Sequence, residues 1–482
     1  MGEEDGTESG EQIGKLKTIW RNRKCAEAGL YWAGAEEKQR RAISILCRGP
    51  KFTIHQARML TGLEKSLGSI YRNSRVCKTP ARCYRIEPDL DKIMQESRDP
   101  KELLWAWKGW RDTVGPPSRE LYPALIMMEN QAAMNNGYNN MGECWREELE
   151  IPDLEQFVEQ LYAEISPLHR LLHAFVRHKL SQMYGRELVD PNTTMPAHLL
   201  GNMWAQSWES LHPELAETIV DLDGAVVNRS TNELFEIAQE FYTSIGFRNM
   251  PKNFWKNSKT VRSENGSCHG TAANMYTKDD YRMLLCWKGQ WEDFYVMHHE
   301  MGHIQYYMAY EKQPTIFKDG ANSAFQEAIG DTIMLAVETR RHLQQIGIIK
   351  KNPILLEDLE LSLLLRQALK KIPQITFGLV VDKWRWGVMS SKILPKDYNA
   401  AWWQYRRKYE GLHPPVLRAE TDFDPAAKFH VADNTPYIRY FLSEFLQFQF
   451  LDILCDVSNT NQKYLLHQCD LYGSKDVGKR MK

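Results

Sequence analysis

Apolar side chains recur every three or four residues along most of this chain, a period typical of amphipathic helices. Residues 97–112 form a Trp-rich stretch with this period, and residues 153–185 form a longer one. The best strand-like run, residues 376–381, lies between helical patterns and is read equally well as a turn of buried helix. No repeat or low-complexity linker interrupts residues 53–482, so the pattern predicts a mainly α domain with a cleft.

Two of the predicted helices carry residues that are typical of a metal site. His299 and His303 are four residues apart, so they project from one helix face and can bind one metal ion. Glu300 lies beside them, within reach of a metal-bound water. On the second helix, Glu327 is the candidate third ligand, and Asp331, one turn further, can accept the second ring N–H of a ligand histidine. Two structural histidines are the alternative for the first motif alone, but both helices together predict a zinc hydrolase site.

Composition and charge fit a globular protein and give no sign of nucleic-acid binding or of a membrane span. A hydrophobic fraction of 43% is ample for a large packed core. Lys and Arg are spread through a chain of net charge −1, so no electrostatic footprint for nucleic-acid binding is present. The uninterrupted apolar runs are much shorter than a bilayer requires, and we therefore predict no membrane span.

Cysteine spacing indicates an extracellular protein. Three close pairs each enclose a loop that a disulfide could close: Cys77/Cys83, Cys268/Cys286 and Cys455/Cys469. Another three cysteines have no evident partner: Cys25, Cys47 and Cys144. Asn-x-Ser/Thr acceptors predict glycosylation at Asn192, Asn228 and Asn265. The alternative is a cytosolic protein with reduced cysteines, because the acidic, Gly-rich start shows no signal peptide.

Several motifs resemble the angiotensin-converting enzyme family of zinc dipeptidyl carboxypeptidases, peptidase family M2. They lie at residues 198–206 (HLLGNMWAQ), 299–306, 327–331, 384–386 (WRW) and 436–441 (PYIRYF). The resemblance covers about residues 70–482 and implies a mainly α helical zincin in which two subdomains flank a deep active-site groove. It also implies short peptide substrates with a free C-terminal carboxylate, dipeptide products and an extracellular location.

The resemblance gives each catalytic residue a role. It implies that His299, His303 and Glu327 bind zinc and that Glu300 is the general base. Residues implied to contact the substrate carbonyl and the oxyanion are His269, His430 and Tyr440.

Further positions match binding residues of the family. Those implied to hold the C-terminal carboxylate of the peptide are Gln206, Lys428 and Tyr437. In the related single-residue carboxypeptidase an arginine replaces Gln206, so glutamine here favours release of a dipeptide. Chloride, the family's activator, is implied at a first site of Arg111, Trp402 and Arg406 and at a second that contains Arg439. Leu149 stands where the family usually has a tyrosine at the second site, which predicts an altered site there.

Other departures from the family lie around the pocket for the C-terminal side chains of the substrate. Gln326 replaces a histidine, Gln374 and Glu444 replace aromatic residues, and Gly270 replaces an alanine. Gln326 is also placed to form a helix capping box with Ser323. The exchange of apolar walls for Gln and Glu predicts a preference for polar or basic C-terminal residues.

The two ends of the chain differ most from the family. Residues 1–52 are expected to be a divergent, partly disordered N-terminal segment, whereas residues 53–482 are expected to be a peptidase domain without the family's last helical segment. Three functions are therefore compatible with the sequence. The leading one is an active zinc dipeptidyl carboxypeptidase; the others are a catalytically silent peptide-binding protein and a helical zincin with aminopeptidase or endopeptidase specificity.

Overall fold

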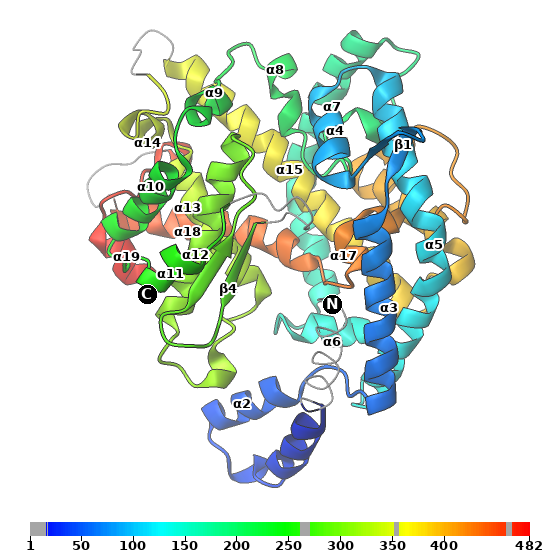
Figure 1. Cartoon of the computed structure of the whole chain (residues 1–482), viewed down its shortest axis with the longest axis vertical. Coiled ribbons are helices and arrows are strands. Elements are labelled where there is room, and N and C mark those ends of the chain that lie inside the picture. Colours follow the sequence, from blue (N-terminus) through cyan, green and yellow to red (C-terminus); the bar gives the residue numbers. More distant parts are fainter. Residues whose placement is uncertain (1–15, 17, 261–269, 351–355, 459–464) are drawn as a thin grey trace. The chain divides into compact units, whose positions relative to one another are not determined.

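The computed structural model describes residues 16, 18–260, 270–350, 356–458 and 465–482. Helices dominate the described chain and the strands form three two-stranded sheets, so the predicted mainly α fold is confirmed (Figure 1). The chain divides into two compact units: unit 1 comprises Met1–Ser210 and Ile372–Ile438, and unit 2 comprises Leu211–Lys371 and Arg439–Lys482. Residues 1–15, most of the segment predicted to be disordered, lie outside the described residues.

Unit 1 is built on long helices around a Trp-rich core. Its helices are α2 (Glu37–Cys47), α3 (Ile54–Asn73), α4 (Asp91–Glu96), α5 (Pro100–Met134), α6 (Met141–Glu147), α7 (Leu154–Tyr184), α16 (Tyr398–Tyr405), α17 (Phe429–Ala432) and the part of α15 (Leu356–Met389) that follows Lys371. The predicted helical stretches at 97–112 and 153–185 are confirmed as α5 and α7. Asp99 and Pro100 explain the start of α5, because the Asp99 side chain accepts from the backbone N–H of Lys101 and proline fits the first helical position.

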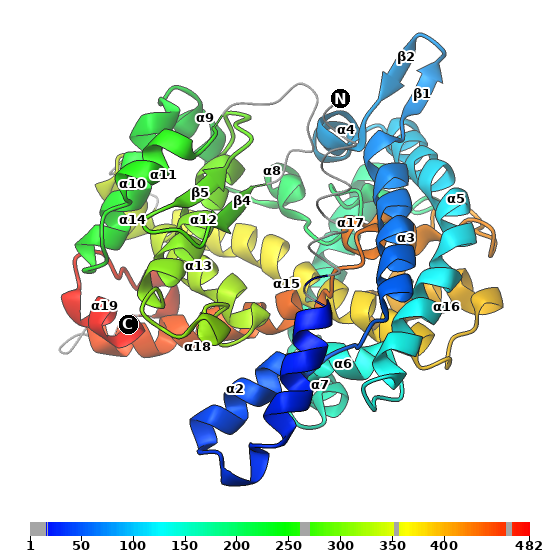
Figure 2. The same cartoon turned by 60° about the horizontal axis from the view of Figure 1, so that its bottom comes forward.

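Short strands complete unit 1. β1 (Val76–Thr79) and β2 (Arg82–Tyr84) form an antiparallel hairpin, visible at the upper right of Figure 2. β3 (Met195–Pro196) and β6 (Leu412–His413) pair in parallel. This second pairing joins the segment before Gln206 to the segment that follows α16.

Unit 2 packs helices around an aromatic and Met-rich core. Its helices are α8 (His212–Leu215), α9 (Leu222–Val227), α10 (Thr231–Ser244), α11 (Lys252–Asn257), α12 (Trp291–Ala309), α13 (Ser323–Val337), α14 (Arg340–Gln345), the start of α15, α18 (Ile438–Ser458) and α19 (Lys475–Met481). The hairpin of β4 (Thr271–Asn274) and β5 (Tyr281–Leu284) is antiparallel. Side chains of α12 such as Trp291, Phe294 and Met301 are buried in this core.

The ambiguous run at residues 376–381 is helical and lies inside α15. All six residues are buried. A segment that is apolar on every side has no polar face to reveal its helical period, which explains why the sequence pattern left the strand reading open.

The structure confirms two of the cysteine pairs predicted from spacing and adds a disulfide that was not predicted. Cys77–Cys83 and Cys455–Cys469 are confirmed. Cys286 is disulfide-bonded, but its predicted partner Cys268 lies outside the described residues. A bond between Cys25 and Cys47, which the sequence left without partners, ties the helix at residues 18–29 to the end of α2. These bonds fit an extracellular protein.

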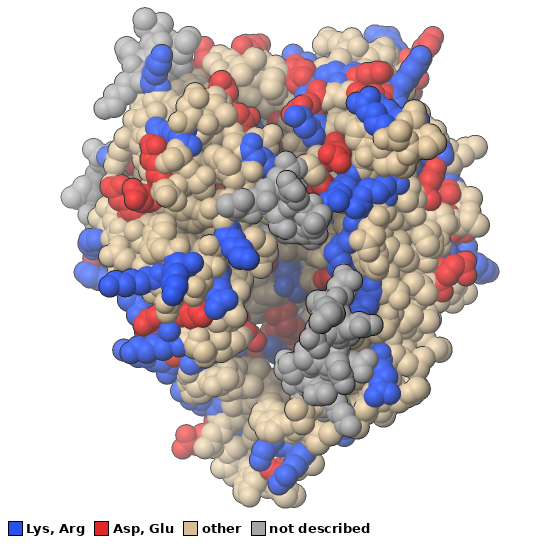
Figure 3. All heavy atoms as spheres, viewed as in Figure 1, with Lys and Arg blue, Asp and Glu red and all other residues tan. Residues whose placement is uncertain are grey.

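The described surface agrees with the charge pattern of the sequence. On the face shown in Figure 3, basic and acidic side chains are interspersed, and neither sign forms a continuous stripe. Among the helices that the structure describes, none combines the length and the apolar character needed to cross a membrane.

Two glycines set how closely α12 approaches α13, which lie side by side in Figure 1. A Cβ atom added to Gly302 would lie 2.6 Å from the Cα of Gly330, and one added to Gly330 would lie 2.5 Å from the backbone oxygen of His299. These contacts involve backbone atoms, so no side-chain rotation could relieve them. The two helices can meet at this distance only because both positions lack a side chain.

We therefore expect Gly330→Ala to separate the two helices and to lower the free energy of unfolding by at least roughly 1–3 kcal/mol. Chemical denaturation followed by circular dichroism measures this change. Gly62→Ala is the matched control, because Gly62 is an exposed position inside α3 where an added Cβ meets nothing within 4 Å. This control should stabilise the protein by about 0.4–1 kcal/mol. Equal effects of the two substitutions would contradict the role of the close approach.

Candidate functional site

Three ligand-type side chains of unit 2 converge where α12 meets α13. Nε2 of His299 and Nε2 of His303 are 3.1 Å apart, and Oε2 of Glu327 lies 3.4 Å from the first and 3.9 Å from the second. One tetrahedral ion with bonds of about 2.0–2.1 Å requires ligand atoms about 3.3 Å apart. The observed spacing and the imidazole and carboxylate donors therefore fit zinc.

Asp331 orients the first of these histidines, as its position in the sequence suggested. Its Oδ1 lies 2.9 Å from Nδ1 of His299, which leaves Nε2 of that ring directed toward Glu327. Tyr295 donates to the same carboxylate oxygen at 2.6 Å, and Nζ of Lys371 lies 3.5 Å from the other oxygen. Burial alone would raise the pKa of Asp331, but Lys371 and His299 hold it well below its ordinary range. The carboxylate therefore stays charged beside the metal ligand.

The same contact acts on the histidine. Burial alone would lower the pKa of His299, yet Asp331 and Glu327 raise it well above its ordinary value. A histidine must lose this proton before it binds a metal ion, so metal binding at this candidate site would release a proton.

A buried charge network continues from Asp331 to α18. Nζ of Lys371 lies 3.7 Å from the carboxylate of Glu444, and Gln447 donates to that carboxylate at 2.6 Å. Burial raises the pKa of Glu444, although Lys371 opposes this effect. Glu444 was predicted from the family resemblance to line a substrate pocket; in the structure it pairs with Lys371, which also pairs with Asp331.

The second histidine ligand has a neutral partner. Oε1 of Gln326 lies 3.4 Å from Nδ1 of His303, and its Nε2 donates to the backbone oxygen of Asp319. The predicted capping box of Ser323 and Gln326 is wrong, because the cap of α13 is Asn322, whose side chain accepts from the N–H of Phe325. Gln326 is therefore free of a capping role and contacts the metal ligand instead.

Glu300 and Tyr440 also belong to unit 2. Glu300 is buried on α12, directly after His299, and a Cβ at Gly270 would lie 3.4 Å from its Oε1. The same Cβ would lie only 2.3 Å from Val296, so the family's alanine would not fit here without a shift.

Tyr440 is half-buried on α18. Its neighbour is Arg439, which was predicted for a second chloride site. Burial raises the pKa of Glu327, whereas the charges of His299, His303 and, to a smaller extent, Arg439 lower it.

The three residues predicted to bind a carboxylate meet in unit 1. Nζ of Lys428 donates to Oε1 of Gln206 at 2.5 Å, and the hydroxyl of Tyr437 lies 3.5 Å from the same oxygen. Lys428 is buried over the ring of Trp204, and burial lowers its pKa to about 7. The charges of Glu87 and Asp91 oppose this effect, but the described part of the chain shows no direct ion pair between Lys428 and a carboxylate. A bound anion would compensate the buried ammonium group.

The segment from His430 in α17 to Tyr437 is held by side chains of α15. Arg385, in the Trp-Arg-Trp motif, donates to the backbone oxygens of His430 at 3.4 Å and Thr435 at 2.5 Å. Asp382 accepts from the N–H of Tyr437 at 2.7 Å. The ring of His430 packs edge-on against Tyr437, with their centroids 4.7 Å apart. The sequence contains the Trp-Arg-Trp motif, but its spacing did not indicate that Arg385 holds the backbone at His430 and Thr435.

The residues predicted for a first chloride site all lie within unit 1. Arg406 lies over the ring of Trp402, 5.6 Å from its centroid, and Arg111 lies over Trp107 at 3.9 Å. Burial lowers the pKa of Arg111 to about 9, and the neighbouring charges of Arg406 and Arg418 act in the same direction, although Asp424 opposes them. Leu149, predicted to alter the second site, is buried in unit 1. The structure therefore brings the residues of the first site together.

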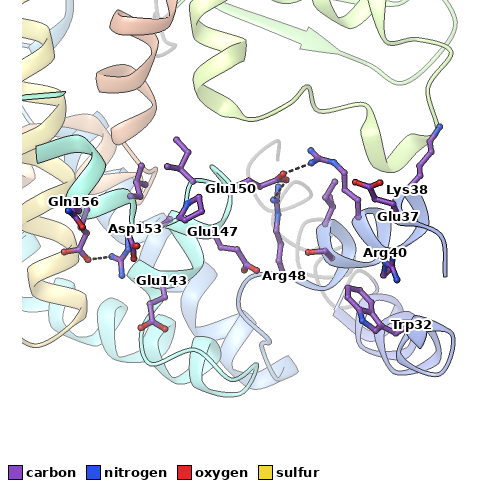
Figure 4. A pocket seen from close by; sticks show the side chains of 18 residues that line it. Trp32, Glu37, Lys38, Arg40, Arg48, Glu143, Glu147, Glu150, Asp153 and Gln156 are labelled. Atoms are coloured by element: carbon purple, nitrogen blue, oxygen red, sulfur yellow. Dashed lines mark hydrogen bonds and ion pairs between the residues drawn. The ribbon is translucent and has the colours of Figure 1, made fainter. Parts of the chain in front are cut away.

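Some predicted residues lie outside these clusters. His269 and Asn265 are outside the described residues, whereas Asn192 and Asn228 are exposed and accessible to a glycan. A cavity of about 1230 Å³ in unit 1, shown in Figure 4, contains none of the predicted site residues. Its walls come from Trp32, from α2 and Arg48, and from α6, the start of α7 and the segment between them, where Glu150 pairs with Arg41 and Arg48.

Comparison with known proteins agrees with this arrangement. A sequence model of a peptidase family, described as angiotensin-converting enzyme, matches residues 27–482. Angiotensin-converting enzyme of Sus scrofa is 42% identical over 420 residues, which are 85% of this chain and 32% of that protein. The enzyme of Theromyzon tessulatum is 39% identical over 436 residues, or 88% of this chain and 70% of that protein. Angiotensin-converting enzyme-like protein Ace3 of Mus musculus is 42% identical over 431 residues, or 88% of this chain and 58% of that protein. The chain therefore belongs to the angiotensin-converting enzyme family, peptidase family M2.

Proposed function

We propose that this chain is a zinc metallopeptidase that releases dipeptides from the free C-terminus of short peptides. The observation that supports it most is the convergence of His299, His303 and Glu327, with Glu300 adjacent on α12 and Asp331 behind the first histidine. Zinc held there supplies a Lewis acid that polarises the scissile carbonyl and makes a bound water more acidic.

The protein's own residues then move the proton. Glu300 accepts a proton from the attacking water and passes it to the leaving amine, so one carboxylate serves as base and then as acid. His430 and Tyr440 donate hydrogen bonds to the oxyanion of the tetrahedral intermediate, where one such donor is worth roughly 3–4 kcal/mol. Asp331 keeps His299 in the tautomer that presents Nε2 to the metal ion.

The substrate carboxylate is bound by Gln206, Lys428 and Tyr437. Supporting this role, Lys428 is buried with a lowered pKa and already contacts Gln206, so a carboxylate would restore its favoured charged form. Binding at this group requires a free C-terminus, which fits a carboxypeptidase better than an aminopeptidase or an endopeptidase.

The role of His269, the role of the two arginines at the first chloride site and the location of the protein are also proposed from the family resemblance. We propose that His269 contacts a substrate carbonyl and that Arg111 and Arg406, which match the family's first chloride site, need a compensating negative charge. An extracellular location is supported by the disulfides and by the exposed acceptors Asn192 and Asn228.

Glu300→Gln removes the proposed base, and we expect dipeptide release to fall by about 10²–10⁴-fold. Mass spectrometry of the products of a C-terminally free peptide, incubated with zinc-loaded protein, measures this loss. The same peptide with a C-terminal amide should be a poor substrate for the unsubstituted protein. Unchanged dipeptide release by the variant would exclude Glu300 as the base. Absence of product from folded, zinc-bound unsubstituted protein would instead support a catalytically silent peptide-binding protein.

Asp331→Asn should weaken zinc binding by about 10–100-fold, because a neutral amide fixes and polarises His299 less than a carboxylate does. Competition with a coloured chelator measures the affinity without any activity assay. Glu233→Gln is a matched control, since Glu233 is exposed in unit 2 and pairs with Arg229. Equal zinc affinities of the Asp331 variant and the unsubstituted protein would show that this hydrogen bond does not support the metal ligand.

The pairing of Glu444 with Lys371 changes the expected substrate preference. Because burial raises the pKa of Glu444 and Lys371 offsets part of its charge, we expect tripeptides ending in Gln to be cleaved at least as well as those ending in Arg, and both better than those ending in Phe. The ratio of kcat/KM values for the three peptides measures this preference. A strong preference for Arg would show that the charge of Glu444 reaches the substrate, and a preference for Phe would contradict a polar pocket.

A further inference from the structure

The buried arginine pair of unit 1 requires negative charge. Arg111 and Arg406 are 2% and 1% exposed, and two guanidinium groups in such an interior are costly unless anions compensate them. Arg111 donates to the backbone oxygens of Trp107 at 3.2 Å and Met203 at 3.0 Å. Its buried Nε has no hydrogen-bond partner in the described chain. These contacts engage donors of Arg111 with backbone oxygens, and the carboxylate whose charge acts on Arg111 is Asp424.

Glu410 supplies a negative charge from within the chain. It ends the single helical turn Arg406–Glu410, is 1% exposed, and its carboxylate forms an ion pair with Nε of Arg406. Burial raises the pKa of Glu410 to about 7, and the charge of Arg406 opposes that increase. A carboxylate this deeply buried is retained in its charged form chiefly by the arginine it faces.

The arginine pair also holds the segment that presents Gln206. Arg406 donates to the backbone oxygen of Trp204 at 2.8 Å, and Arg111 donates to that of Met203. The next residue, Ala205, has a φ of 59°, a left-handed conformation that a non-glycine residue keeps only when its surroundings impose it. The arginines therefore fix the backbone immediately before Gln206.

The same segment is tied to Lys428. The indole N–H of Trp204 donates to the backbone oxygen of Ala427 at 2.6 Å, and Nζ of Lys428 lies 4.2 Å from the centre of the indole ring. Arg406, Trp204, Lys428 and Gln206 are therefore linked by a continuous series of contacts within unit 1.

We propose that Glu410 is a built-in anion for Arg406 and a positioning residue for the carboxylate-binding group. It occupies the role that a small free anion would otherwise fill, so the geometry of Gln206 and Lys428 depends little on chloride. This inference rests on the proposed peptidase function for its kinetic consequence. Its consequence for anion binding does not depend on activity.

The first experiment measures anion binding directly. Glu410→Gln keeps the shape of the side chain but removes its charge, which leaves the arginine pair to recruit a free anion. We expect chloride to raise the melting temperature of this variant much more than that of the unsubstituted protein, because a ligand stabilises the state that binds it. Gluconate at equal ionic strength controls for screening. Crystals soaked in bromide should show an anomalous peak beside Arg111 and Arg406 only in the variant.

The second experiment measures the effect on the substrate site. At pH 8, where Glu410 is charged, KM for a C-terminally free peptide should change little with chloride in the unsubstituted protein. In chloride-free buffer Glu410→Gln should raise KM by at least about fivefold, and chloride should reverse this increase, as for coupled sites. Glu159→Gln is the matched control, since Glu159 lies near the same turn and contacts Tyr409 and Lys383 instead of Arg406.

The two experiments distinguish a failure of this proposal from a failure of the proposed peptidase function. If no peptide is cleaved, the peptidase function fails, while the melting temperatures and the bromide peak still decide the role of Glu410. If Glu410→Gln folds only in chloride, that requirement itself supports a built-in anion. The proposal is overturned if the unsubstituted protein and the variant respond to chloride equally, whether both strongly or not at all.

Discussion

The contact of α12 with α13 at Gly302 and Gly330 is the constraint on which the candidate metal centre depends. Packed helices are usually 8–10 Å apart, a distance set by the side chains between them. A metal site tolerates errors of only about 0.2 Å in its ligand distances. His299 and Glu327 have short side chains on two different helices, so the separation of the helix backbones decides whether their ligand atoms meet. The glycines fix that separation through backbone contact, which is stiffer than contact between side chains.

Each unit surrounds its functional groups with buried countercharges. In unit 2, Asp331 faces His299 and Lys371, and Glu444 balances Lys371 from the opposite side. In unit 1, Arg406 faces Glu410. Buried charges have few alternative positions, because any movement that breaks a pair leaves an ion in a low-dielectric interior. These pairs therefore restrict the movement of the side chains at the candidate metal centre and at the proposed carboxylate-binding group, even where their net contribution to stability is small.

The sequence predicted the parts of this structure that depend on local periodicity. The helices α5, α7, α12 and α13, and the convergence of His299, His303 and Glu327, follow from regular spacing and from motifs confined to one or two helices. Family resemblance placed Gln206 with Lys428 and Arg111 with Arg406, which are far apart in the chain. Partners without a local signal were missed. Tyr295 and Lys371 around Asp331, Gln326 beside His303 and the bond between Cys25 and Cys47 depend on tertiary packing, which a single sequence does not encode in its spacing.

Cys144 is the one free thiol among the described cysteines, and it is buried in α6. Burial and the nearby Glu147 raise its pKa to about 12, so in the folded protein it is almost entirely the unreactive thiol. Reaction with an alkylating reagent therefore requires this part of unit 1 to open. The rate of that reaction reports the free energy of the opening, in the same way that amide exchange does elsewhere in a protein. The chain thus carries its own chemical reporter of local unfolding, far along the sequence from the ligands of the candidate metal centre.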